Sequence, residues 1–168
     1  MTIESKIIET LQGDEQKDSL ELIMWLKEYK LNPLQSSKTT WKISAKACVV
    51  CYFRFDFNKK KITIQPIISE YGCNSLSEEM KDIALRNKVH GRYCGDKCHG
   101  CHCSYKLRTI FGKKSNDVCG QSIIFKNPNA EENECIKELI KMRKNVIQNG
   151  ILMPVLPRNF CLVNKSND

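Results

Sequence analysis

The segment V-V-C-Y-F-R-F-D-F, which spans residues 49–57, decides the fold because its side chains alternate with a period of two. An extended backbone places them on opposite faces, with Val49, Cys51, Phe53, Phe55 and Phe57 on one and Val50, Tyr52, Arg54 and Asp56 on the other. The first face is apolar and the second largely polar. This pattern predicts a half-buried antiparallel strand.

Two further strands are predicted next to this segment. Asn58-Lys59-Lys60 predicts a turn, after which Ile62 and Ile64 alternate with polar residues on a return strand. The stretch from Trp41 to Ala45 predicts the preceding strand, and a linker is expected over residues 34–38. Strands joined by short turns predict an antiparallel β-meander.

A first helix is predicted upstream of the strands, from Asp18 to Lys30. Asp18 is its expected N-cap and Glu21 its capping-box partner, and Asn32-Pro33 ends it. Apolar residues recur at i, i+3, i+4 and i+7 and predict a buried stripe: Leu22, Trp25, Leu26 and Tyr29.

Two more helices are predicted after the meander. One begins near Ser75, with Glu78 closing a capping box, and buries Met80, Ile83 and Ala84. A short strand follows over Ser122–Phe125.

The last helix opens at Asn127-Pro128, or at Asn129 with Glu132, and ends at about Asn149. Its inner face is expected to consist of six residues, Ile136, Leu139, Ile140, Arg143, Val146 and Ile147. The stem of Arg143 is expected to carry its charge outward. Together these elements predict an α+β fold in which the meander packs with about three helices.

The 168 residues fit one domain over residues 1–150, followed by an extended tail over residues 151–168. Prolines 154 and 157 exclude a helix in the tail. No apolar run approaches the roughly 20 residues of a membrane span, so no membrane partner is expected. The first 11 residues lack the apolar core of a signal peptide, which predicts a cytoplasmic location with reduced thiols.

The segment C-G-D-K-C-H-G-C-H-C, residues 94–103, predicts a metal-binding loop over residues 90–119. Thiolate and imidazole are the ligands that zinc and iron–sulfur clusters select. The preferred zinc ligands are four cysteines, Cys94, Cys98, Cys101 and Cys119, with Cys103, His99 and His102 as substitutes. An iron–sulfur cluster is the alternative cofactor.

Two cysteines outside this loop are expected in the core. Cys48 and Cys51 have the spacing of a zinc pair, but an extended backbone points them to opposite faces, so Cys51 is expected to be plain core. Cys135 falls on the inner face of the last helix. Both are therefore expected to pack as small apolar residues.

The formal net charge of +8 is unevenly distributed along the chain. Residues 86–114 hold eight basic residues and one acid, a net +7, whereas residues 1–28 hold seven acids and three lysines, a net −4. Four residues of the basic segment, Lys106, Arg108, Lys113 and Lys114, are the predicted contacts to nucleic acid or an acidic protein. A solvated surface is the alternative meaning of such charge.

Three functions remain open at this stage. The first is a zinc-stabilised binding module, and the second is a protein that handles iron or zinc inside the cell. The third is a thiol redox or iron–sulfur protein. Cys94-x₃-Cys98-x₂-Cys101 resembles the motif of radical S-adenosylmethionine enzymes, but the chain after His102 is too short for their barrel. No phosphate-binding glycine loop or catalytic triad is evident, so the sequence favours a protein that is not an enzyme.

Two resemblances extend this interpretation. The order helix, β-meander, helix, short strand and final I-K-E-L-I-K-M-R-K helix (residues 136–144) resembles the frataxin-like (YdhG-type) bacterial proteins of α+β fold. Residues 41–57 and 122–146 carry this likeness, which implies intracellular iron delivery. The whole chain, with its cysteine loop and Thr109-Ile-Phe-Gly112, also resembles small cysteine-rich bacterial proteins.

Overall fold

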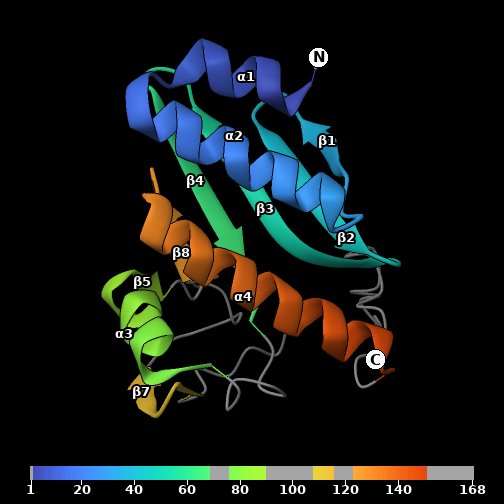
Figure 1. Cartoon of the computed structure of the whole chain (residues 1–168), viewed down its shortest axis with the longest axis vertical. Helices are drawn as coiled ribbons and strands as arrows, with labels where there is room; N and C mark the ends of the chain where they lie inside the picture. Colours follow the sequence, from blue (N-terminus) through green and yellow to red (C-terminus); the bar gives the residue numbers. More distant parts are fainter. Residues whose placement is uncertain (1, 69–75, 90–107, 116–122, 151–168) are drawn as a thin grey trace, which may run out of the picture.

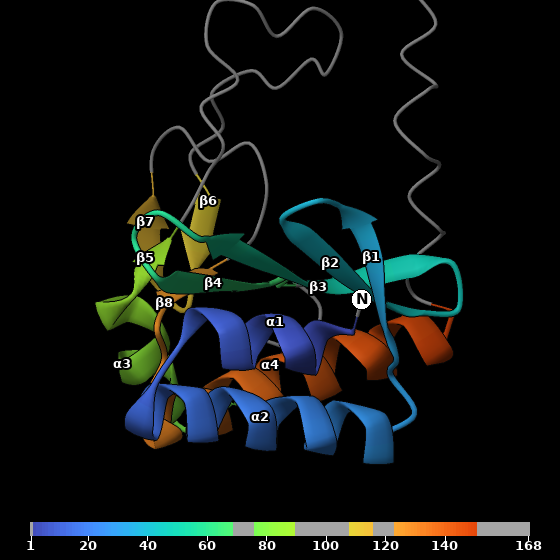
Figure 2. The same cartoon turned by 90° about the horizontal axis from the view of Figure 1, so that it is seen from above.

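An antiparallel sheet with helices packed against one face forms the centre of the molecule (Figures 1 and 2). The computed structural model describes residues 2–68, 76–89, 108–115 and 123–150. The sheet has the order β1-β2-β3-β4-β8-β5. Its strands, in that order, are Pro33–Ser37, Thr40–Ala45, Cys48–Asp56, Lys61–Pro66, Ile123–Lys126 and Lys88–Val89. The α+β class predicted from the sequence is thus confirmed.

Within the described residues, four helices accompany the sheet: α1 (Ile3–Thr10), α2 (Gly13–Glu28), α3 (Glu78–Arg86) and α4 (Ala130–Gln148). Figure 2 shows α1, α2 and α4 together on one side of the sheet, so the opposite face carries none of these three helices. A separate hairpin consists of β6 (Arg108–Ile110) and β7 (Lys113–Ser115). In the part of the chain that the structure describes, no helix is long and apolar enough to cross a membrane.

The core begins with one row of side chains that crosses four neighbouring strands. Trp41 pairs with Phe53, Phe53 with Ile64, and Ile64 with Phe125, and none of the four is more than 2% exposed. The helices bury apolar residues among the same core cluster, including Ile7 of α1, Leu22 and Leu26 of α2, and Leu139 and Ile140 of α4. Burying apolar surface of this kind is the main favourable contribution to folding.

A β-bulge changes the alternation of β3. Ile43 pairs with Cys51 but Ser44 pairs with Val49, so Val50 is an extra residue on β3. As a result Cys48, Val50 and Cys51 are all buried, whereas a strict period of two assigns Val50 to the polar face. The prediction that Val50 lies on the polar face was therefore wrong, while Cys51, Phe53 and Phe55 are buried as expected.

The N-terminal part of the chain also differs from its prediction. The helix expected to begin at Asp18 begins at Gly13, so Asp18 and Glu21 lie inside it. Asp14 and Glu15 occupy its first turn, where a carboxylate is favoured by the helix dipole. Helix α1 was not predicted at all, and residues 33–37, expected to be mostly linker, form strand β1. Proline at the start of an edge strand removes no needed hydrogen bond.

The later elements agree more closely with expectation. Helix α4 begins after Asn129, whose side chain accepts a bond from Glu132 N while Glu132 accepts one from Asn129 N. Helix α3 is capped by Ser77, whose hydroxyl accepts from Met80 N at 3.2 Å; the expected cap Ser75 lies outside the described residues. The predicted tail, residues 151–168, also lies outside them.

Candidate metal centre

The predicted ligands Cys94, Cys98, His99, Cys101, His102, Cys103 and Cys119 all lie outside the described residues. The structure instead defines the framework from which their segment starts and to which it returns. Val89, the last residue of β5, pairs with Ile123, the first residue of β8. Antiparallel partners lie about 5 Å apart, so the chain leaves and re-enters the sheet at neighbouring positions.

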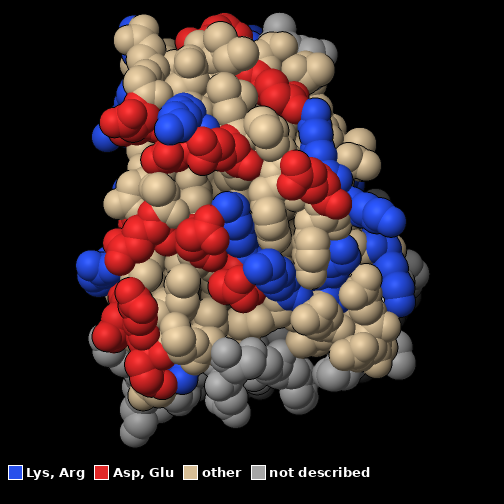
Figure 3. All heavy atoms as spheres, viewed as in Figure 1, with Lys and Arg blue, Asp and Glu red and all other residues tan. Residues whose placement is uncertain are grey.

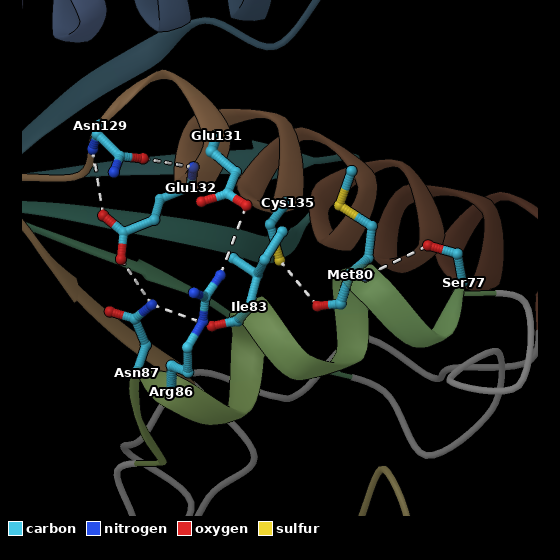
Figure 4. Close-up of polar contacts among 9 residues, drawn as sticks. All are labelled: Ser77, Met80, Ile83, Arg86, Asn87, Asn129, Glu131, Glu132 and Cys135. Atoms are coloured by element: carbon cyan, nitrogen blue, oxygen red, sulfur yellow. Dashed lines mark hydrogen bonds and ion pairs between the residues drawn. The ribbon is translucent and has the colours of Figure 1, made fainter.

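Polar contacts between the end of α3 and the start of α4 position the chain that enters β5 (Figure 4). Asn87 follows the helix and donates both to Ile83 O at 3.1 Å and to Glu132 Oε1 at 2.8 Å. Arg86 forms an ion pair with Glu131 at 3.5 Å. Because these residues directly precede β5, the chain that enters β5 is held against the first turn of α4.

The β6–β7 hairpin lies within this segment. Arg108 pairs with Ser115 and Ile110 with Lys113, and the turn residues Phe111 and Gly112 have φ values of 47° and 79°. Two successive positive φ values are typical of the tight hairpin turns whose twist matches that of the strands. The hairpin therefore brings the chain shortly after Cys103 back beside the chain shortly before Cys119.

The four residues predicted to contact nucleic acid or an acidic partner fall in or next to this hairpin. Lys106 lies outside the described residues, while Arg108 belongs to β6 and Lys113 and Lys114 belong to β7. Thr109 pairs with Lys114 in the hairpin register. The backbone thus brings Arg108, Lys113 and Lys114 onto one short hairpin.

The described cysteines have a different character. Cys48, Cys51 and Cys135 are buried free thiols, and Cys51 and Cys135 lie in the core as expected. Desolvation raises the pKa of Cys51 well above its ordinary range, and it raises the pKa of Cys135 to about 12 with help from Glu132. Metal binding needs the thiolate, so burial makes Cys51 and Cys135 poor ligands. Among the described residues there is no group of three or more metal-binding side chains.

Arg143 lies on the inner face of α4 as predicted, but little of it reaches solvent. Its side chain was expected to extend outward, but the residue is 7% exposed on the inner face of α4. Its Nε is buried and has no hydrogen-bond partner. Burial lowers the pKa of Arg143, and the neighbouring Cys48 opposes this shift. The burial of Arg143 follows from its place on the inner face of α4, where Val146 and Ile147 in the next turn are also buried.

The sequence analysis also missed a polar surface on the face of the sheet opposite α1, α2 and α4. Lys42, Tyr52 and Gln65 form one cross-strand row, and Arg54, Thr63 and Lys126 belong to the next. The sequence did contain a sign of this surface, because the alternation along residues 49–57 assigned Tyr52 and Arg54 to the polar side of their strand. The register with the neighbouring strands was needed to assemble the surface.

No protein-family model, curated protein or solved structure matches the chain.

Proposed function

We propose that the protein is a small zinc-binding module in which one structural Zn²⁺ is held by Cys94, Cys98, Cys101 and Cys119. Cys103, His99 and His102 are the substitute ligands. The density of thiol and imidazole groups in residues 94–103 suits a tetrahedral zinc site. The ion stabilises the segment that carries the basic hairpin, and the hairpin presents its cations to nucleic acid or an acidic partner.

The pairing of Val89 with Ile123 is the observation that supports this proposal best. A metal that joins Cys94 to Cys119 must close a long loop, and the cost of closure depends on how far apart its ends are. Pairing at β5–β8 holds the ends of the segment together, and the β6–β7 hairpin removes part of the free chain between the ligands. Both features reduce the conformational entropy that the loop loses when it closes around the metal.

Burial of Cys51 and Cys135 supports the same assignment. Cys51 and Cys135 keep their protons because their surroundings are apolar, so they compete poorly for the ion. The ligands are thus expected among the cysteines of the loop.

Metal analysis of protein purified without oxygen tests the proposal. We expect about one zinc per chain, a colourless solution, and loss of the metal in Cys98→Ser but not in Cys161→Ser. Cys98→Ser should also lower the melting temperature far more than Cys161→Ser, because a structural ion contributes directly to folding. A metal-free protein, or a brown one that contains iron and labile sulfide, would show that the proposal is wrong.

A further inference from the structure

The described charges are sorted between the two layers of the fold. The helix layer (residues 3–28, 78–86 and 130–148) holds 14 acidic and nine basic residues, a net −5. The sheet layer without β5 (residues 33–66 and 123–126) holds eight basic residues and Asp56 as its one acid, a net +7. The +8 of the chain therefore does not reside in the cysteine-rich segment alone, and a second cationic region belongs to the sheet.

The two layers also differ in how their cations are compensated. Seven of the nine basic residues in the helix layer form ion pairs: Lys6, Lys17, Lys27, Lys81, Arg86, Lys137 and Lys141. Figure 3 shows the helix-covered side of the molecule, where acidic and basic side chains lie interleaved. In the described sheet layer, Lys59 pairs with the carboxylate of Asp56. Lys42, Lys61 and Lys126 are exposed and form no such pair with a described carboxylate.

Strand register places several of these cations on the face opposite α1, α2 and α4. Trp41, Phe53 and Phe125 point into the core, so their chain neighbours Lys42, Arg54 and Lys126 lie on the opposite face of the sheet. Lys42 is the partner of Tyr52, and the next row runs from Thr40 through Arg54 and Thr63 to Lys126. With strands about 4.8 Å apart, this row is about 14 Å long.

Tyr52 gives the cationic face an aromatic centre. The Arg54 guanidinium lies over the Tyr52 ring, 5.2 Å from its centroid, and Arg54 also donates to Gln65 Oε1. Tyr52 is half-buried, so its ring is held by the sheet yet partly open to solvent. An unstacked base can stack on an aromatic ring or on a guanidinium group. Lysines around such a pair attract the phosphates of the same strand.

We propose that this face, formed by Lys42, Tyr52, Arg54, Thr63 and Lys126, binds single-stranded nucleic acid. A duplex stacks its bases internally and leaves their faces closed to side chains, whereas a single strand presents both base faces and phosphates. An acidic protein would use the lysines but would gain nothing from the ring. The proposal adds a partner and a surface to the zinc module, and it stands without the metal because none of these residues is a proposed ligand.

Fluorescence anisotropy with a labelled 15-nucleotide oligouridylate RNA and a duplex of equal length tests the proposal. At about 50 mM salt we expect micromolar or tighter binding of the single strand and several-fold weaker binding of the duplex. Tyr52→Phe should bind about as well as the unmodified protein, and Tyr52→Thr about tenfold or more weakly, because stacking on one aromatic ring contributes roughly that much. Thermal melting of both variants confirms that they are folded.

Charge reversal supplies the matched control. Lys42→Glu with Lys126→Glu should weaken binding steeply and reduce the slope of log affinity against log salt by about one to two. Lys17→Glu with Lys27→Glu changes the net charge equally on α2 and should leave most of the affinity. Equal losses in the two double variants, equal affinity for the duplex, or no binding at 50 mM salt would overturn the proposal. Zinc content, measured on every variant, separates failure of this surface from failure of the metal site.

Discussion

Cys135 illustrates how burial controls chemistry at the scale of one residue. Its thiol is fully buried between α4 and α3, and Sγ donates to Met80 O at 3.4 Å (Figure 4). Desolvation and the nearby Glu132 raise the pKa of this thiol to about 12 in the folded protein. A thiol in the unfolded chain ionises near pH 8.5. The folded state therefore holds its proton over a pH range in which the unfolded state loses it.

Stability should accordingly fall as the solution becomes alkaline. The contribution of the protonated Cys135 thiol to the free energy of unfolding is fully present below about pH 8.5. It is lost as pH rises towards 12, by about 1.4 kcal/mol per pH unit. We expect the stability difference between the unmodified protein and Cys135→Ala to shrink by about 1–2 kcal/mol between pH 8 and 10. Urea denaturation of both proteins at each pH measures this difference in the free energy of unfolding. A difference that does not change with pH would contradict a raised pKa of Cys135.

Arg143 is a second residue whose environment conflicts with its charge. The residue is 7% exposed, and its buried Nε lacks a hydrogen-bond partner. Desolvating a charge without compensation is unfavourable, and an apolar side chain of similar volume is often neutral or stabilising in its place. We expect Arg143→Met to raise the free energy of unfolding by about 1 kcal/mol. Denaturation in urea measures this, with Lys144→Met as a control at a neighbouring, less buried position. A clear loss of stability in Arg143→Met would show that the charge is compensated.

At the scale of single elements, α4 has the most completely capped start among the described helices. Asn129 and Glu132 bond reciprocally at 2.9 and 3.1 Å, and Glu132 also accepts from Asn87. Asn129→Ala should reduce the free energy of unfolding by about 1 kcal/mol, because an orphan amide of the first turn loses its acceptor. Asn129→Asp keeps an acceptor and should cost little. Equal effects of the two variants would mean that the cap is not formed in solution.

How well each element could be predicted depended on how much of its pattern was local. The cap residues and inner face of α4 were evident in the sequence because helical period and capping box coincide there. Strand β1 has little apolar pattern, since four of its five residues are exposed, and only pairing with β2 defines it. The bulge at Val50 likewise depends on the register between two strands and has no signature in β3 alone.

Helix α1 shows that a local signal was present but unused. Ile3, Ile7 and Leu11 recur every four residues and are at most 3% exposed. This spacing is that of an amphipathic helix, and Thr2 caps it by accepting from Ser5 N. For the candidate metal site the sequence supplies the ligand types and their spacing. The β5–β8 pairing that joins the ends of the segment involves residues far apart in sequence and needed the structure.

Across the whole molecule, stability is expected to concentrate in the middle of the sheet. Strands β3 and β4 are flanked by partners on both sides and carry Phe53, Ile62 and Ile64, all fully buried. Strand β1 is an edge strand with an exposed surface. Amides in the centre of β3 should therefore exchange with solvent deuterium only through near-global unfolding, and those of β1 through local opening.

Hydrogen exchange followed by mass spectrometry measures this distribution. We expect protection in β3 and β4 to exceed that in β1 by several orders of magnitude at neutral pH. Helix α4, which packs on the sheet through Ile136, Leu139 and Ile140, should resemble β3. Similar exchange rates in β1 and β3 would contradict this distribution of stability.

The pairing of Val89 with Ile123 also has consequences for evolution and engineering. Because the chain departs and returns at adjacent positions, residues 90–122 occupy a point where sequence can be exchanged without changing the register of any described strand in the main sheet. A two-residue Asn-Gly turn is long enough to join two paired strands. A lineage could thus acquire, lose or replace the cysteine-rich segment while inheriting the same scaffold. A designer could graft an unrelated binding loop at the same position.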